Sequence, residues 1–291
     1  MTGGASRPRA RAEQWIALDP DPETRAELEA LLASGDDDAL AERFAGRLAF
    51  GTAGLRGAMG AGPMRMNRLV VRQSAAGIAR HLLAEVDDAA RRGVVVAHDA
   101  RHRSGVFADD CAQILSAHGI RVVLREAPAP TPVGVFAIRH LGCAAGIVVT
   151  ASHNPPADNG LKLYMGDGAQ IVPPTDGMVA AAIDAVVADG VLVAGHRAPG
   201  AVEPMGEEVI DAYRAATLAR VPPPAAPIRI ATTATHGVGG ALLSELLASA
   251  GYHDVHPVAE QEQPDPDFPT VAFPNPEEPG VTDLLAARMR D

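Results

Sequence analysis

Between residues 93 and 151 the chain alternates three short apolar runs with two segments of helical spacing, and this alternation most constrains the fold. Runs such as GVVVAHD are rich in valine and end at polar residues, which is typical of buried strands. Parallel neighbouring strands need a crossover segment, and helices supply it. We expect strands at 93–99, 120–126 and 145–151 and helices at 104–118 and 131–141. The sequence therefore predicts an α/β fold with mixed, mostly parallel sheets sandwiched by helices.

The segments around this core have weaker patterns. Small, polar and basic residues predict disorder at 1–10, and apolar spacing predicts short helices between 12 and 48. A glycine-rich stretch at 50–62 leads into a helix that ends near residue 86. A strand at 160–165 is followed by Gly-Asp-Gly, so we expect it to turn into a hairpin. Further helices are expected near 174–188 and 206–219.

A second α/β unit follows VPPPAAP at 221–227, which is the clearest linker in the chain. Its expected elements are a strand at 228–234, a helix at 238–250 and a strand at 254–259. A last helix begins in EEPGVTDLLAARMRD, and a parallel sheet needs a further strand after such a crossover. The assigned domains are an N-terminal helical extension at 1–48, a first domain at 49–205 and a truncated second domain at 206–291.

The composition restricts the partners and the compartment. A formal net charge of −11 argues against a general nucleic-acid binder, which would carry a basic face. No apolar run is long enough to span a membrane, and no apolar stretch follows the N-terminal arginines as in a signal peptide. Cys111 and Cys143 lie in apolar runs and are expected to be reduced core residues. We therefore expect a cytoplasmic protein that contacts neither nucleic acid nor membrane, with its oligomeric state left open.

The segment TASHNPPADNGLKLY at 150–164 places a serine directly after a buried strand. Ligands bind at the carboxyl ends of strands in open α/β sheets, so Ser152 stands where a nucleophile is expected. Acyl transfer is the weaker alternative, because adjacent Ser152 and His153 cannot easily form the hydrogen bond of a hydrolase and no G-x-S-x-G turn is present. Phosphoryl transfer needs positive charge and donors around the serine oxygen, which Arg56, His153 and Lys162 can supply.

Lys162 is the only lysine among the 25 lysines and arginines of the chain. A lysine loses its proton when it is desolvated, so it can act as a general acid or base, which arginine cannot do. Chance retention on a surface hairpin is the alternative explanation. In HDARHRS at 98–104, Arg101, Arg103 and Ser104 could either bind phosphate at a helix N-terminus or be structural partners of the serine loop.

Several of these motifs together resemble a known family. TASHNPPADNGLKLY, with FGTAGLRGAMG before it and THGVGG after it, is similar to the α-D-phosphohexomutases, which are the phosphoglucomutases and phosphomannomutases. GTAGLRGAMGAGPMRMN resembles the phosphoglucomutase-like and phosphopentomutase-like branch of that family. The match runs from about Phe50 to the end of the chain and includes PDPDFPTVAFPNPEEPG. The resemblance implies the N-terminal half of a four-domain enzyme, with the first domain and part of the second.

The resemblance also implies an intramolecular phosphotransferase that interconverts sugar 1-phosphates and 6-phosphates. A resting phosphoserine gives its phosphoryl group to the sugar monophosphate, and the resulting bisphosphate reorients and returns its other phosphate. Ser152 matches the phosphoserine, Lys162 the general acid/base lysine, Arg56 the arginine beside the phosphoserine and His153 the histidine of the serine loop. The candidate phosphate-binding residues are Thr52, Arg56, Arg101, Ser104 and Asn154. The sugar is left open among glucose, mannose and pentose phosphates.

A phosphoserine adds about two negative charges, which need to be balanced. The resemblance implies Mg²⁺ bound by an oxygen of phosphorylated Ser152 and by three aspartates of a D-x-D-x-D-R loop. This sequence contains no such loop, and PDPDFP at 264–269 has two aspartates with no arginine after them. The alternative prediction is therefore a catalytically incomplete, truncated fragment, or a non-catalytic remnant that binds phosphosugars.

Overall fold

The structure is a computed structural model that describes residues 6–192 and 200–290. From residue 6 onward the N-terminal segment forms three helices, α1 (Ser6–Leu18), α2 (Pro22–Ser34) and α3 (Asp37–Arg43). The expected disorder at 1–10 is wrong for residues 6–10, which begin α1, and residues 1–5 lie outside the described part. Alanine, arginine and glutamate are good helix formers, and their abundance in this segment explains the difference.

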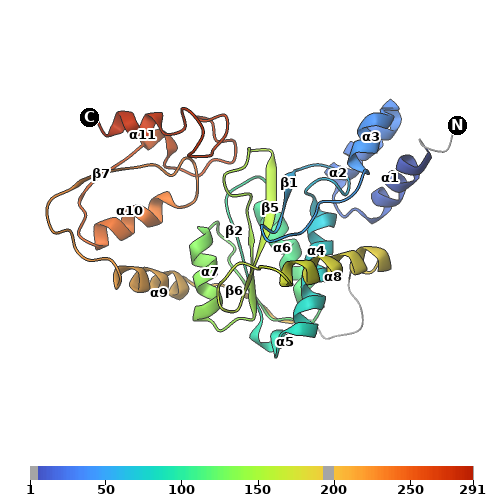
Figure 1. Ribbon diagram of the computed structural model, residues 1–291, viewed down its shortest axis with the longest axis horizontal. Coiled ribbons are helices and arrows are strands. Elements are labelled where there is room, and N and C mark those ends of the chain that lie inside the picture. The colour runs from blue at the N-terminus through green and yellow to red at the C-terminus, as the bar shows by residue number, and fades with distance from the viewer. Residues whose placement is uncertain (1–5, 193–199, 291) are drawn as a thin grey trace.

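Within the described residues, a six-stranded main sheet has the order β1-β5-β4-β2-β3-β6. Its strands are β1 (Leu55–Ala58), β2 (Val94–His98), β3 (Val122–Leu124), β4 (Ala145–Val149), β5 (Asp158–Met165) and β6 (Val202–Pro204). β4, β2, β3 and β6 pair in parallel, and β5 runs antiparallel to both of its neighbours. The predicted α/β fold with a mixed, mostly parallel sheet is therefore confirmed (Figure 1).

Helices cover both faces of this sheet. They are α4 (Arg68–Glu85), α5 (Ala89–Arg92), α6 (Ser104–Ala117), α7 (Thr131–His140), α8 (Thr175–Asp189) and α9 (Glu207–Leu218). On one face, α4 and α6 place Ile78 and Phe107 in one core with Val94 of β2. On the other face, α7 places Ile138 in a second core with Val95. Because successive residues of a strand point to opposite faces, β2 is buried on both sides.

The strands and helices expected between 93 and 151 are confirmed, with ends that differ by one or two residues. The edge strands β1 and β6 were not expected, because each is short and is defined by its pairing rather than by an apolar run. The turn expected after 160–165 is present, because the N–H of Gly168 donates to the carbonyl of Met165 at 2.8 Å and an antiparallel bridge joins Tyr164 to Gln170. In the described residues this return stays a single bridge rather than a full strand, and β5 pairs along its length with β4 and β1.

The C-terminal part forms a smaller α/β unit, drawn in orange to red in Figure 1. Its elements are β7 (Arg229–Thr232), α10 (Gly240–Ser249), β8 (Asp254–Pro257), the 3₁₀ helix η1 (Ala259–Gln261) and α11 (Asp283–Arg288). β7 and β8 pair in parallel, in line with the restart of the strand and helix pattern after the linker. In the described ranges, no helix combines the length and the apolar character that crossing a membrane would take.

Candidate active site

The candidate active site lies at the carboxyl end of β4, where the chain leaves the sheet. Thr150 and Ala151 stay buried, whereas Ser152 is exposed. Ser152 has a φ of 56°, in the left-handed region that costs a non-glycine residue about 1–3 kcal/mol. Its N–H donates to Thr150 Oγ1 at 2.9 Å, and the N–H of Asn154 donates to the carbonyl of Ala151 at 3.0 Å. These bonds fix a tight turn that places Ser152 at the rim of the sheet.

Arg101 supports the serine loop, which we define as residues 152–158. Its two Nη atoms donate to four backbone carbonyls, those of Ser152 at 2.9 Å, Asn154 at 2.6 Å, Pro155 at 2.8 Å and Asp158 at 3.3 Å. The residue is 5% exposed, and burial lowers the pKa of its guanidinium. A guanidinium carries five N–H groups, and four of them are used by the loop. The geometry therefore favours support of the loop by Arg101 over phosphate binding.

Ser104, in the first turn of α6, bonds to Asp99 near Arg101 and to Asn159, the residue that follows the serine loop. Its Oγ donates to Asp99 Oδ1 at 2.6 Å and accepts a hydrogen bond from Asn159 Nδ2 at 3.0 Å. Asp99 Oδ1 also accepts from the N–H of Arg101 at 3.0 Å. Ser104 is fully buried, so the geometry again favours a supporting role over contact with phosphate. Sequence reasoning missed Asp99 and Asn159, although Asp99 directly follows β2, at the strand end where ligand sites occur.

Arg56 brings positive charge to the serine loop from β1, and Lys162 lies on β5, the neighbouring strand in the sheet. Arg56 is exposed and donates from Nη1 to Asn154 Oδ1 at 3.0 Å. Lys162 is half-buried and lies opposite Val148 of β4 in the antiparallel register. Burial lowers the pKa of Lys162 and repulsion by Arg56 lowers it further, while Asp99 acts in the opposite direction. A lysine whose pKa is lowered suits proton transfer near neutral pH.

Of the two remaining candidates, His153 lines a cavity beside Ser152 and Thr52 lies outside it. His153 is exposed and, together with Ser152, lines a cavity of about 420 Å³. The facing wall of this cavity comes from the C-terminal unit and includes Thr233, Thr235, His236, Asp265 and Phe268. Thr52 is exposed in the turn before β1. Among the described residues, the wall of this cavity includes neither Thr52 nor Arg56 nor Lys162.

The acidic residues that the structure describes do not by themselves build a magnesium site. In the described ranges, no group of three or more His, Cys, Asp or Glu side chains is arranged to hold a metal ion. Asp99 is hydrogen-bonded to neighbouring groups, and Asp267 of PDPDFP pairs with His102 at 2.7 Å. Ser152 would contribute one phosphate oxygen after phosphorylation, so the residues present do not fit a complete Mg²⁺ site.

The chain is similar to known proteins over most of its length, including the serine loop. The family model described as "Phosphoglucomutase/phosphomannomutase, alpha/beta/alpha domain I" matches residues 47–188, and the corresponding domain II model matches residues 211–291. A "Probable phosphoribomutase" of Schizosaccharomyces pombe is 38% identical over 283 residues, which cover 94% of this chain and 48% of that protein. A "Phosphopentomutase" of Mus musculus is 34% identical over 283 residues, which cover 91% of this chain and 45% of that protein.

The fold is also shared with a solved structure. The X-ray structure of a phosphoglucomutase/phosphomannomutase family protein from Burkholderia thailandensis has a TM-score of 0.66 at 24% identity, covering 83% of this chain and 49% of that one. The chain spans about half the length of the curated relatives it matches. Because the models of the two domains match in order and together cover most of the sequence, this chain belongs to the phosphoglucomutase/phosphomannomutase family, the α-D-phosphohexomutases.

Proposed function

We propose that this chain belongs to a sugar phosphomutase in which Ser152 carries the transferred phosphoryl group. The names phosphoribomutase and phosphopentomutase of the relatives support phosphate exchange on a sugar phosphate, between its 1- and 6-phosphate forms in the case of a hexose. The observation that carries the proposal is an exposed Ser152 on a turn fixed by Arg101, with Arg56 bound to the same loop and Lys162 close enough to Arg56 for its pKa to be lowered by it.

The two transfers exchange phosphate and proton between the sugar, Ser152 and Lys162. In the first, a hydroxyl oxygen of the sugar monophosphate attacks the phosphorus on Ser152. The bond from phosphorus to Ser152 Oγ breaks, the bond to the sugar oxygen forms, and the hydroxyl proton passes through the amine of Lys162 to the leaving Ser152 Oγ. After the bisphosphate reorients, the hydroxyl of Ser152 takes the other phosphoryl group, and its proton passes through Lys162 to the leaving sugar oxygen. The lowered pKa of Lys162 increases the fraction of neutral amine.

Arg56 has the charge and position to balance the phosphate. A phosphoserine carries about two negative charges at neutral pH, and guanidinium groups form strong charge-assisted hydrogen bonds to its oxygens. Arg56 is exposed and already contacts the serine loop through Asn154, so it can reach a phosphate on Ser152 without rearrangement of β1. Mg²⁺ would neutralise the same charge when bound, but the described residues alone do not form its site.

Transfer of radiolabel from glucose 1,6-bisphosphate to the protein tests this proposal. The expected result is protein-bound label in the wild-type chain and none in Ser152→Ala. Ser34→Ala is the matched control, because it removes a serine hydroxyl at the end of α2, and it should keep the label. Label that persists in Ser152→Ala would refute the role of this hydroxyl.

A second candidate function is phosphate acceptance without mutase turnover by the 291-residue chain. It is favoured because no group of three or more His, Cys, Asp or Glu side chains that could hold a metal ion is present in the described ranges. A magnesium-dependent assay of mutase turnover on this chain separates the two candidates. Sustained turnover supports the first candidate, and labelling without turnover supports the second.

A further inference from the structure

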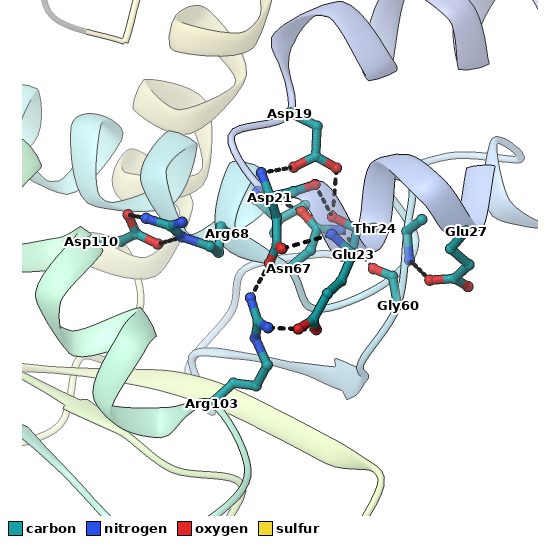
Figure 2. Close-up of polar contacts among 12 residues, drawn as sticks. Asp19, Asp21, Glu23, Thr24, Glu27, Gly60, Asn67, Arg68, Arg103 and Asp110 are labelled. Carbon is teal, nitrogen blue, oxygen red and sulfur yellow. Dashed lines mark hydrogen bonds and ion pairs between the residues drawn. The ribbon is translucent and has the colours of Figure 1, made fainter. Parts of the chain in front are cut away.

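The N-terminal helices contact the loop that supports the serine loop. Figure 2 shows Arg103 reaching from the start of α6 to the beginning of α2, where it contacts Asp21 and Glu23. Arg103 lies two residues after Arg101. We propose that the N-terminal helical segment is a positioning element for the serine loop and that the ion pair of Asp21 with Arg103 is its main contact. The consequence for phosphoryl transfer rests on the proposed function of Ser152.

Asp21 needs a cation because its side chain is only 4% exposed. Removal of an unpaired carboxylate from water is costly, so a buried carboxylate is normally held by donors and a positive charge. Arg103 Nη2 pairs with Asp21 Oδ2, and Arg103 Nη1 donates to Glu23 Oε2 at 2.8 Å. Arg68, which lies nearby in Figure 2, is bound through two nitrogens to Asp110 at 2.7 and 2.9 Å. Arg103 is therefore the cation that pairs directly with Asp21.

The carboxylate of Asp21 is itself held in a fixed place. Its Oδ1 caps α2 by accepting from the N–H of Glu23 at 3.1 Å. Its own N–H donates to Asp19 Oδ1 at 3.0 Å, and Asp19 Oδ2 accepts from Thr24 Oγ1 at 2.7 Å. Asp19 and Asp21 are 2% and 3% exposed. Such a buried, fully bonded turn is a rigid anchor for the arginine that reaches it.

The anchored arginine has a backbone conformation that needs support. Arg103 has a φ of 66°, a left-handed value that is uncommon for a residue with a side chain, and it precedes α6 without capping the helix through its side chain. The next residue, Ser104, bonds to Asp99, and Asp99 also accepts from the N–H of Arg101. A change in the Arg103 backbone is thus transmitted over two residues to the guanidinium that holds four carbonyls of the serine loop.

The same helices also contact the end of the glycine-rich stretch, just after β1. Glu27 of α2 pairs with Arg43, and its Oε2 accepts from the N–H of Ala61 at 2.9 Å. The N-terminal segment therefore contacts two places, the loop that contains Arg103 and the segment just after β1. β1 is the strand that carries Arg56. Both contacts join helices and loops that are far apart in the sequence.

Asp21→Asn is the most specific test, because asparagine caps a helix as well as aspartate does but carries no charge for Arg103. The matched control is Asp37→Asn, which removes an exposed partner of Arg9 in α3. Hydrogen exchange of the whole chain should become about fivefold faster or more in residues 152–158 of Asp21→Asn, because loss of the anchor favours local opening. Exchange in β4 should stay unchanged, and Asp37→Asn should match the wild type throughout.

A pair of substitutions at Arg103 covers the case in which Asp21→Asn does not fold. Arg103→Gln should show the same faster exchange in residues 152–158, and Arg103→Lys, which keeps the charge, should restore slower exchange. The inference is overturned if exchange of the serine loop is unchanged in Asp21→Asn and Arg103→Gln, or rises only together with that of β4. Label uptake from glucose 1,6-bisphosphate on the same samples separates the two proposals. If the serine loop of the variants exchanges faster but the wild-type chain takes up no label, the proposed function alone is contradicted. If the wild-type chain takes up label but the serine loop of the variants exchanges at the wild-type rate, the positioning role alone is contradicted.

Discussion

Replacement of Arg101 by methionine tests the largest single support of the serine loop. Methionine keeps much of the length and apolar surface of the buried side chain, and it can still contact Phe268, whose ring centroid lies 4.9 Å from the guanidinium carbon. It removes four hydrogen bonds to backbone carbonyls, three of which are 2.6 to 2.9 Å long. A hydrogen bond to a charged group contributes about 1.5–3 kcal/mol, but the freed carbonyls of an exposed loop regain water. We therefore expect a loss of about 2–4 kcal/mol in the free energy of unfolding.

Urea unfolding followed by circular dichroism measures this loss as a lower midpoint at an unchanged slope. Arg91→Met is the matched control, because Arg91 is 80% exposed and pairs with Asp88, and its midpoint should equal that of the wild type. A midpoint for Arg101→Met that equals that of the control would refute the argument that these carbonyl bonds stabilise the loop. A lower slope would instead indicate that the denatured or native state had changed in compactness.

Two further predictions concern the strands next to the serine loop. Arg56→Gln should raise the pKa of Lys162, which can be followed through the one resonance of isotope-labelled lysine; an unchanged titration would show that Arg56 does not act on it. Since the folded pKa of Lys162 lies below its unfolded value, the folded state gains stability as pH rises through the window between the two, and this gain should be smaller in Arg56→Gln. Gly54→Ala should lower the free energy of unfolding by about 2–4 kcal/mol, because its φ is 81° and a Cβ would lie 2.0 Å from the carbonyl oxygen of Leu161. Gly35→Ala has a similar φ of 71° with no atom within 4 Å, so a loss as large as that of Gly54→Ala would contradict the role of this contact.

The buried strands could be predicted because a continuous apolar run indicates a strand that is buried on both faces. β2 and β4 are buried along their whole length, and both were expected from valine and isoleucine alone. β1 and β6 could not be found in this way, since β1 lies in a glycine-rich stretch and β6 has two exposed residues. Their existence depends on partners that are distant in the sequence, and propensity carries no information on that pairing. The same reason explains why the pairing of β5 with β4 and β1 could not be predicted.

In the candidate site, too, some residues could be predicted from the sequence and others could not. Ser152 and Lys162 could be singled out from the sequence, because one follows a buried strand and the other is the only lysine. The support by Arg101 could not be decided, since it depends on contacts across 51 to 57 residues. The contact of Arg103 with Asp21 spans 82 residues and had no sequence signal. Cys111 and Cys143, expected as reduced core residues, are both buried and free.

The most direct test of the central claim is mass spectrometry of the tryptic peptide 140–162 after incubation with glucose 1,6-bisphosphate. The account predicts a phosphate on Ser152 that disappears when a sugar monophosphate is added as acceptor. An unmodified peptide, or a phosphate located on Thr150, would contradict it.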